Sequence, residues 1–240
     1  MTRFFVSPAA LGAGQVRLTG ADAHHATRVL RLGPGDGLTL LDGTGRVVEA
    51  RVTAIEGREV ALAVVSEAHE APDGPPITLV QALPKGDKLD WIVQKATELG
   101  VAAIRPVAAS RCVVRLDADR SQGKLRRWEA IAREAAEQCE RPDLPRIYPP
   151  VSLEALGWAP GDTVLVLAER ARGGTLAAVL PPAAPTGIWV LVGPEGGWAP
   201  EELERLEALG ARCVSLGPRI LRTETAGLAA LAVIQARYDG

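Results

Sequence analysis

The spacing of hydrophobic and polar positions changes near residue 70. Before that point, short apolar runs separated by Gly-, Pro- and Asp-rich turns predict strands at residues 16–18, 38–41, 47–55 and 60–65. Residues 21–32 lie between the first two strands and carry Ala26, Val29, Leu30 and Leu32 at roughly helical spacing. Short strands joined by tight turns are typical of a small β-barrel. We therefore expect residues 1–70 to form a barrel-like domain.

The second part of the chain alternates between strand and helix patterns. Continuous apolar runs predict strands at residues 163–167 and 188–192, and further strands are expected at residues 77–82 and 213–216. Apolar residues three and four positions apart predict helices at residues 89–99, 125–139, 199–209 and 223–236. This alternation indicates an α/β domain with a mostly parallel, doubly wound sheet over residues 77–240. The Pro- and Gly-rich stretch at residues 71–76 is the expected linker.

Composition narrows the class of protein. Hydrophobic residues make up 47% of the 240 residues and charged residues 23%, which is typical of a soluble globular chain. No apolar run is long enough to span a membrane, and the first residues lack the pattern of a secretion signal, so we expect a cytoplasmic protein without a membrane partner. Cys112, Cys139 and Cys213 are far apart and share no metal-ligand spacing with a histidine, so we expect no metal.

The charge is unevenly distributed. The formal net charge is -2, which argues against a surface that is basic throughout. Residues 105–127 nevertheless hold seven basic residues against two acidic ones. The seven are Arg105, Arg111, Arg115, Arg120, Lys124, Arg126 and Arg127. Such a local excess can contact nucleic-acid phosphates, and we expect binding that weakens steeply with salt.

Two glycine-bearing loops follow predicted strands. The first, Gly193-Pro194-Glu195-Gly196-Gly197, comes directly after the strand at residues 188–192. Ligands of open α/β sheets bind beyond the carboxyl ends of strands, and glycines let backbone N–H groups approach them closely. A tight turn without a ligand, with Glu195 capping the next helix, is the alternative. Neither the P-loop pattern nor the usual dinucleotide fingerprint is present.

The second loop runs from Leu216 to Ala226, where Gly217-Pro218 leads into the last helix. Two such loops can form the walls of one cofactor pocket. The plainer alternative makes Arg222 a surface cation and Thr223 and Thr225 helix caps. The helix that follows is apolar on nearly every side, which requires burial in the core or at a subunit interface.

Several short motifs, in order along the chain, resemble one family. They are Arg3-Phe4-Phe5, His24-His25 with residues 28–31, Lys85-Gly86-Asp87-Lys88, residues 94–101, Glu137-Gln138-Cys139 with Arg141-Pro142, residues 193–197, and residues 216–226. Together they resemble the bacterial 16S ribosomal RNA uracil-N3 methyltransferases of the SPOUT superfamily. Trp198 departs slightly from the pattern, because an aromatic that is usually Phe is expected there, and Pro218 lies inside the last motif.

The resemblance implies a fold, a cofactor and partners. It implies a PUA-like RNA-binding barrel at the N-terminus, a C-terminal SPOUT sheet with a trefoil knot, a homodimer, and 16S rRNA or the small ribosomal subunit as substrate. The implied cofactor is S-adenosylmethionine. Its expected contacts are Leu167, Val192, Gly193, Pro194, Glu195, Gly196, Gly197, Leu216, Gly217, Ile220, Leu221, Arg222, Thr223 and Ala226.

The chemistry of N3 methylation suggests catalytic residues. Uracil N3 carries a proton, so its methylation requires a cation that stabilises the anionic base or a general base that removes the proton. Arg222 and Arg3 are the candidates for the cation, and Glu195 or Glu224 for the base. N3 lies on the Watson–Crick edge, so the target must be unpaired or flipped out.

Several side chains are candidates for gripping the RNA backbone. They are His25, Arg28, Arg31, Arg111, Arg115 and Lys124, with His24 beside the first of them. A solvated helix face is the alternative for the group at residues 24–31. Two other functions stay open: a SPOUT enzyme acting on another RNA such as transfer RNA, and a non-catalytic RNA-binding or ribosome assembly factor.

Overall fold

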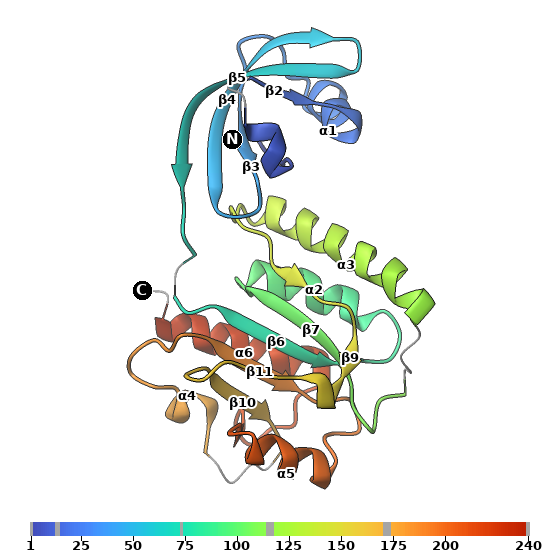
Figure 1. Cartoon of the computed structure of the whole chain (residues 1–240), viewed down its shortest axis with the longest axis vertical. Coiled ribbons are helices and arrows are strands. Elements are labelled where there is room, and N and C mark those ends of the chain that lie inside the picture. The colour runs from blue at the N-terminus through green and yellow to red at the C-terminus, as the bar shows by residue number, and fades with distance from the viewer. Residues whose placement is uncertain (1, 13–14, 73, 114–117, 170–173, 239–240) are drawn as a thin grey trace. The chain divides into compact units, whose positions relative to one another are not determined.

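The chain folds into two compact units. The computed structural model (Figure 1) describes residues 2–12, 15–72, 74–113, 118–169 and 174–238, and does not describe the side chains of residues 118–121. One unit consists of Met1–Pro72 and Ala136–Leu144, and the other of Asp73–Ala135 and Pro145–Gly240. The division at residue 72 lies inside the expected linker, but residues 136–144, which the sequence placed in the domain at residues 77–240, belong to the first unit.

The N-terminal unit is built on a five-stranded sheet in the order β1-β3-β4-β5-β2. Its strands are β1 (Arg3–Phe5), β2 (Gln15–Leu18), β3 (Gly37–Leu41), β4 (Arg46–Glu56) and β5 (Glu59–His69). The pair β1–β3 is parallel and the other pairs are antiparallel. Alternate side chains of these strands, including Val16, Leu18, Val48 and Leu62, are buried in one core. The strands predicted after residue 15 are all present, and β1 is additional.

Short helices accompany this sheet. They are the 3-10 turn η1 (Pro8–Leu11), the helix α1 (Gly20–His24) and the π-helical turn η2 (His25–Val29). The last two together fill the predicted helical stretch at residues 21–32. Arg31 then adopts a left-handed φ of 56°, which ends the helical run, while Leu32 N–H donates to Ala26 O at 2.9 Å. Ala23 and Ala26 face the core, and His24, His25 and Arg28 are exposed.

Residues 136–144 join the N-terminal unit through packing that no sequence period signals. Ala136 is fully buried in a cluster with Phe5, Leu41 and Val47. The chain then forms bridges between Asp143 and the Gly43–Thr44 turn, and Leu144 N–H donates to Gly43 O at 3.0 Å. Since Gly43 has a φ of 81°, it takes the left-handed conformation that this turn requires.

The second unit confirms the predicted parallel α/β sheet. Its strands follow the order β12-β10-β11-β6-β7-β8, with β9 also paired to β7, and every pairing is parallel. They are β6 (Ile77–Ala82), β7 (Ala103–Ala108), β8 (Arg146–Ile147), β9 (Val151–Ser152), β10 (Thr163–Leu167), β11 (Ile188–Val192) and β12 (Arg212–Val214). Strands β6, β10 and β11 have the predicted bounds, whereas β7, β8 and β9 were not predicted.

Helices cover both faces of this sheet (Figure 1). They are α2 (Lys88–Glu98), α3 (Ala118–Gln138), η3 (Leu153–Ala155), α4 (Leu176–Val179), α5 (Pro200–Ala208) and α6 (Thr223–Tyr238). Residues of α2, α3, α4 and α6 pack in one core with Leu79, Ile104 and Leu165, and residues of α5 pack in a second core with Val80, Val107 and Val166. Among the described residues, no helix is both long and apolar enough to cross a membrane.

The carboxyl ends of three neighbouring strands lie level with one another. Leu167 at the end of β10 is paired with Val192 at the end of β11 and with Val214 at the end of β12. The loops that follow these strands therefore leave the sheet side by side. This is the edge where ligands of open α/β sheets bind.

Candidate active site

A cavity of about 800 Å³ lies at this edge of the sheet. Its walls are residues 167–169 after β10, residues 192–198 after β11 and residues 214–223 after β12, with Lys88, Arg111, Leu203 and Ala226 completing the lining. All fourteen residues expected to contact the cofactor lie on these walls. Lys88, Arg111 and Ser215 also line the cavity but were not predicted to belong to it.

The glycine loop after β11 is fixed by Trp198. The indole is buried, and its Nε1–H donates to the carbonyl oxygen of Leu167 at 3.2 Å. Its ring lies so close to Gly193 that a Cβ added there would be 3.1–3.2 Å from three indole atoms. Gly197, with a φ of 69°, closes the turn by donating its N–H to Pro194 O at 2.9 Å. The loop is therefore a tight turn, as well as a wall of the cavity.

The segment after β12 is joined to the same loop at Thr223. The hydroxyl of Thr223, the first residue of α6, is buried and donates to Gly193 O at 2.6 Å. The residue before it, Arg222, accepts hydrogen bonds at its carbonyl from the N–H groups of Thr225 and Ala226, both at 2.9 Å. Its guanidinium is exposed on the cavity wall and, within the part of the chain that the structure describes, has no ion pair within 4 Å.

Lys88, at the start of α2, forms ion pairs with the glycine loop after β11 and with the start of α6. Its Nζ lies 3.2 Å from a carboxylate oxygen of Glu195 and 3.1 Å from one of Glu224. The two carboxylates raise the pKa of Lys88. Burial alone would raise the pKa of Glu195, but hydrogen bonds from its own N–H, from Lys85 N–H and from Lys88 outweigh burial and lower that pKa. Glu195 is therefore a carboxylate already engaged as an acceptor and a weakened base.

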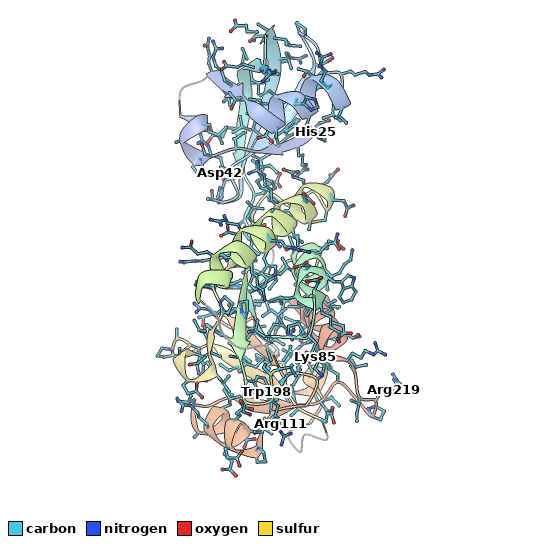
Figure 2. All side chains as sticks on the ribbon, turned by 90° about the vertical axis from the view of Figure 1, so that its right-hand side faces the viewer. His25, Asp42, Lys85, Arg111, Trp198 and Arg219 are labelled. Atoms are coloured by element: carbon cyan, nitrogen blue, oxygen red, sulfur yellow. The ribbon has the colours of Figure 1, made fainter. Side chains whose placement is uncertain are left out.

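Arg111 also holds the glycine loop. Its guanidinium donates to Gly196 O at 3.0 Å, and its side chain lies against the position that a Cβ of Gly196 would occupy. Lys85, Arg111, Trp198 and Arg219 all lie on the α/β unit, and the side chain of Arg219 projects outward from it (Figure 2). The structure thus places Arg111, predicted as an RNA contact, in the wall of the cavity.

The other predicted residues are spread over the two units. Arg3, on β1, donates to Glu140 O at 2.5 Å and pairs with the Glu140 carboxylate at 3.6 Å within the N-terminal unit. His25 packs edge-on against Phe4, with 5.9 Å between ring centroids. Arg28 and Arg31 are exposed on the N-terminal unit, and Lys124 is exposed on α3. Arg115 lies outside the described residues.

The basic stretch at residues 105–127 is divided by the fold. Arg105, on β7, lies over the ring of Tyr148 with 3.6 Å from Cζ to the centroid, and 5.3 Å from that of Trp189. Arg111 follows β7, and Lys124 and Arg127 belong to α3. The side chain of Arg127 pairs with Asp90. The described basic residues of this stretch therefore lie on β7, on the segment after it and on α3.

The three cysteines are free thiols. Burial and a hydrogen bond with Glu207 raise the pKa of Cys213 to about 11, so that thiol stays protonated at neutral pH. Among the described residues, no group of three or more His, Cys, Asp or Glu side chains could hold a metal ion.

Comparison with known proteins identifies the class. Residues 71–235 match the RNA methyltransferase domain, and residues 18–65 match the RNA methyltransferase PUA domain. The chain is therefore an RNA methyltransferase with an α/β domain and an N-terminal PUA-like domain.

The family follows from whole-chain relatives. The chain is 38% identical over 226 residues to the ribosomal RNA small subunit methyltransferase E of Bacillus subtilis, covering 90% of this chain and 88% of that protein. It is 40% identical to that of a Synechocystis strain, covering 99% and 78%. A crystal structure of the Neisseria gonorrhoeae protein bound to S-adenosyl methionine has a TM-score of 0.88 and 35% identity, covering 99% of this chain and 98% of that one. The chain belongs to the ribosomal RNA small subunit methyltransferase E family, and the resemblance noted from its motifs is confirmed.

Proposed function

We propose that this protein transfers the methyl group of S-adenosylmethionine to N3 of one uridine in 16S rRNA of the small ribosomal subunit. The observation that carries the proposal is the cavity at the ends of β10, β11 and β12, with the exposed guanidinium of Arg222 on its wall. Family membership supports the RNA substrate, and the cofactor named for the Neisseria gonorrhoeae relative supports S-adenosylmethionine.

The residues of the cavity fit this cofactor. A volume of about 800 Å³ lies within the range of about 300–1,000 Å³ usual for small-molecule sites. Leu167, Val192 and Leu216 offer apolar surface for an adenine ring. At Gly197 and Gly217 an added Cβ would meet no atom within 4 Å, so backbone groups at these positions are open to a ligand. When bound, the cofactor supplies an activated methyl group on a sulfonium.

The protein's chemical task is to generate the nucleophile. Loss of the N3 proton leaves a negative charge on the uracil ring, and a cation beside the ring stabilises it. We assign this role to Arg222, whose charge no described carboxylate neutralises. Glu195, the predicted base, is held as an acceptor by Lys88 and Lys85 N–H, and Glu224 is paired with Lys88. We therefore propose that the proton leaves to solvent and that both glutamates shape the cavity instead.

RNA binding involves both units in this proposal. The exposed residues His25, Arg28 and Arg31 on the N-terminal unit, and Lys124 on α3, would contact backbone phosphates. Arg3, the other predicted cation, bonds Glu140 and stays a lesser candidate. Since N3 takes part in base pairing, the target uridine must be unpaired or flipped out when it reaches the cavity.

We further propose a homodimer formed through α6. Gly227, Ala230, Leu231 and Ile234 of this helix are buried, but Ala232 on its other side is exposed. Trp91 of α2, which packs against α6, is 45% exposed. An apolar surface of this kind is typical of a subunit interface. The trefoil knot stays a prediction of the family resemblance, and the cytoplasmic location stays a prediction from the sequence pattern.

A methylation assay tests the proposal. The purified protein is incubated with radiolabelled S-adenosylmethionine and, separately, unmethylated small subunits, protein-free 16S rRNA and transfer RNA. We expect label in 3-methyluridine from a small-subunit substrate only, and little label with the Arg222→Ala variant. Label confined to transfer RNA would assign the protein to another branch of RNA methyltransferases. Cofactor binding without label in any RNA would indicate a non-catalytic RNA-binding factor.

A further inference from the structure

A buried glutamine lies behind the cavity, at the carboxyl end of β6. Gln81 is completely buried, and its Nε2 donates to Thr223 Oγ1 at 2.9 Å and to Ala82 O at 3.1 Å. Its Oε1 is buried and has no hydrogen-bond partner among the described residues. An unpaired buried acceptor costs stability, and an apolar side chain of the same size would fill this space without that cost. Packing alone therefore does not account for an amide at this position.

The direction of the hydrogen bonds shows what the amide does. Nε2 of Gln81 can only donate, so the oxygen of Thr223 must accept. The single hydrogen of the Thr223 hydroxyl is then directed to Gly193 O, at 2.6 Å. The three residues form one chain from β6, through the start of α6, to the glycine loop. The carbonyl of Gly193 is thereby set by a side chain 112 positions away in the sequence.

The helix that carries Thr223 packs closely against the strand that carries Gln81. At Gly227, on the buried side of α6, an added Cβ would lie 3.2 Å from Leu79 Cδ1, 3.3 Å from Val192 Cγ2 and 3.5 Å from Gln81 Oε1. The helix thus lies directly on β6 and β11, and a Cβ at this contact would be tighter than most Cβ contacts. Thr223, four residues earlier on the same helix, therefore lies next to Gln81, with 2.9 Å between its Oγ1 and Gln81 Nε2.

We propose that Gln81 is a positioning residue for cofactor binding: through the Thr223 hydroxyl it fixes the Gly193 peptide in the cavity wall. Gln81 itself is not among the described residues that line the cavity. The inference rests on the proposed function, because it assumes that the cavity binds S-adenosylmethionine. Gln81 would thus affect cofactor binding only through Thr223 and Gly193.

A double-mutant cycle on the full chain tests this. The variants are Gln81→Met, which keeps the size but removes the donor, Thr223→Val, and the two combined. We expect each single variant to weaken S-adenosylmethionine binding about tenfold, since each breaks the same chain of hydrogen bonds. The combined variant should also lose about tenfold rather than the roughly hundredfold of two independent effects. Calorimetric titration gives the affinities, and thermal melting gives the stabilities.

Two further variants distinguish a specific effect on cofactor binding from a general loss of stability. Thr223→Ser keeps the hydroxyl and should bind like the unaltered protein. Thr97→Val removes another fully buried hydroxyl, which donates to Val93 O at 2.8 Å within α2. It should lower the melting temperature without changing the affinity.

The possible failures are distinguishable. Single variants with lowered melting temperatures but affinities within about twofold of the unaltered protein would show that Gln81 only packs, and multiplicative losses would show that it does not act through Thr223. If Gln81→Met does not fold, the contrast between Thr223→Val and Thr223→Ser decides. If the unaltered protein does not bind S-adenosylmethionine, the proposed function fails and the inference fails with it.

Discussion

Replacing Gly193 with alanine tests how rigidly the cavity wall is held. Gly193 is not in the left-handed region, so alanine is compatible with its backbone. The new Cβ would lie 3.1 Å from Trp198 Nε1 and 3.2 Å from both Cδ1 and Cε2, which is tighter than most Cβ contacts. The indole cannot retreat easily, because it is buried and bonded to Leu167 O.

The size of the effect follows from this crowding. Loop and ring must separate by a few tenths of an ångström, and overpacking of this kind costs about 1–3 kcal/mol. In the free protein the loop can move into the cavity to relieve it. A bound cofactor occupies that space, so we expect about 1–2 kcal/mol to appear as weaker binding, which is roughly a 5- to 30-fold rise in Kd.

Calorimetric titration of Gly193→Ala with S-adenosylmethionine measures this directly, and thermal melting reports any loss of the fold. Trp198→Phe provides the matched background, because it removes the indole nitrogen and frees the ring from Leu167 O. The alanine should then weaken binding less than it does beside Trp198. A Kd for Gly193→Ala within about twofold of the unaltered protein, or an equal loss in both backgrounds, would refute the reasoning.

Four other outcomes are expected. Lys88→Met should raise the Kd for S-adenosylmethionine, because the two walls lose their shared cation; Lys88→Arg should recover much of the affinity in the same titration. Arg222→Ala should lower the methylation rate in single turnovers about a hundredfold while the cofactor Kd changes little, and an unchanged rate would remove Arg222 from the mechanism. The lowered pKa of Glu195 means that its carboxylate contributes stability above its unfolded pKa, near 4.5, and that this is lost as pH falls through the folded pKa. Melting temperatures should therefore fall less between neutral and acid pH for Glu195→Gln than for the unaltered protein. Arg28→Gln and Lys124→Gln should each reduce the salt dependence of RNA binding by about one unit of slope, measured by filter binding.

The fold was predictable where the apolar residues follow a simple pattern along the sequence. The bounds of β10 and β11 follow from nearly continuous apolar runs, because these strands are buried on both faces. Strand β7 lies in the same sheet but was missed, since Arg105 and Pro106 interrupt its apolar pattern. The structure shows why the arginine is tolerated: its guanidinium is stacked on Tyr148, a residue 43 positions later. The contact between Arg105 and Tyr148 cannot be predicted from the sequence, because it forms only when the fold brings the two segments together.

The candidate site also has a part that the local sequence reveals and a part that it does not. The glycine loops were predicted because glycines directly after a buried strand indicate a ligand-binding loop, and parallel strands bring such loops to one edge of the sheet. Lys88 and Arg111 were missed as wall residues because their contacts, with Glu195 and Gly196, join segments 107 and 85 residues apart. Nothing in the local pattern of a helix start or a post-strand loop reveals a partner at that distance.

The glycines of the loops and the side chains that contact those loops have different roles in the site. The glycines give the cavity its shape but no rigidity, since glycine is the least restricted residue. Rigidity comes from side chains other than the glycines: Trp198 packs against one side of Gly193, Thr223 donates to its carbonyl, and Gln81 directs the Thr223 hydroxyl. A chain that kept every glycine but lost these contacts would bind the cofactor in a loop free to move. The capacity to bind should therefore vary with Gln81, Thr223 and Trp198 even when the glycine loops are unchanged.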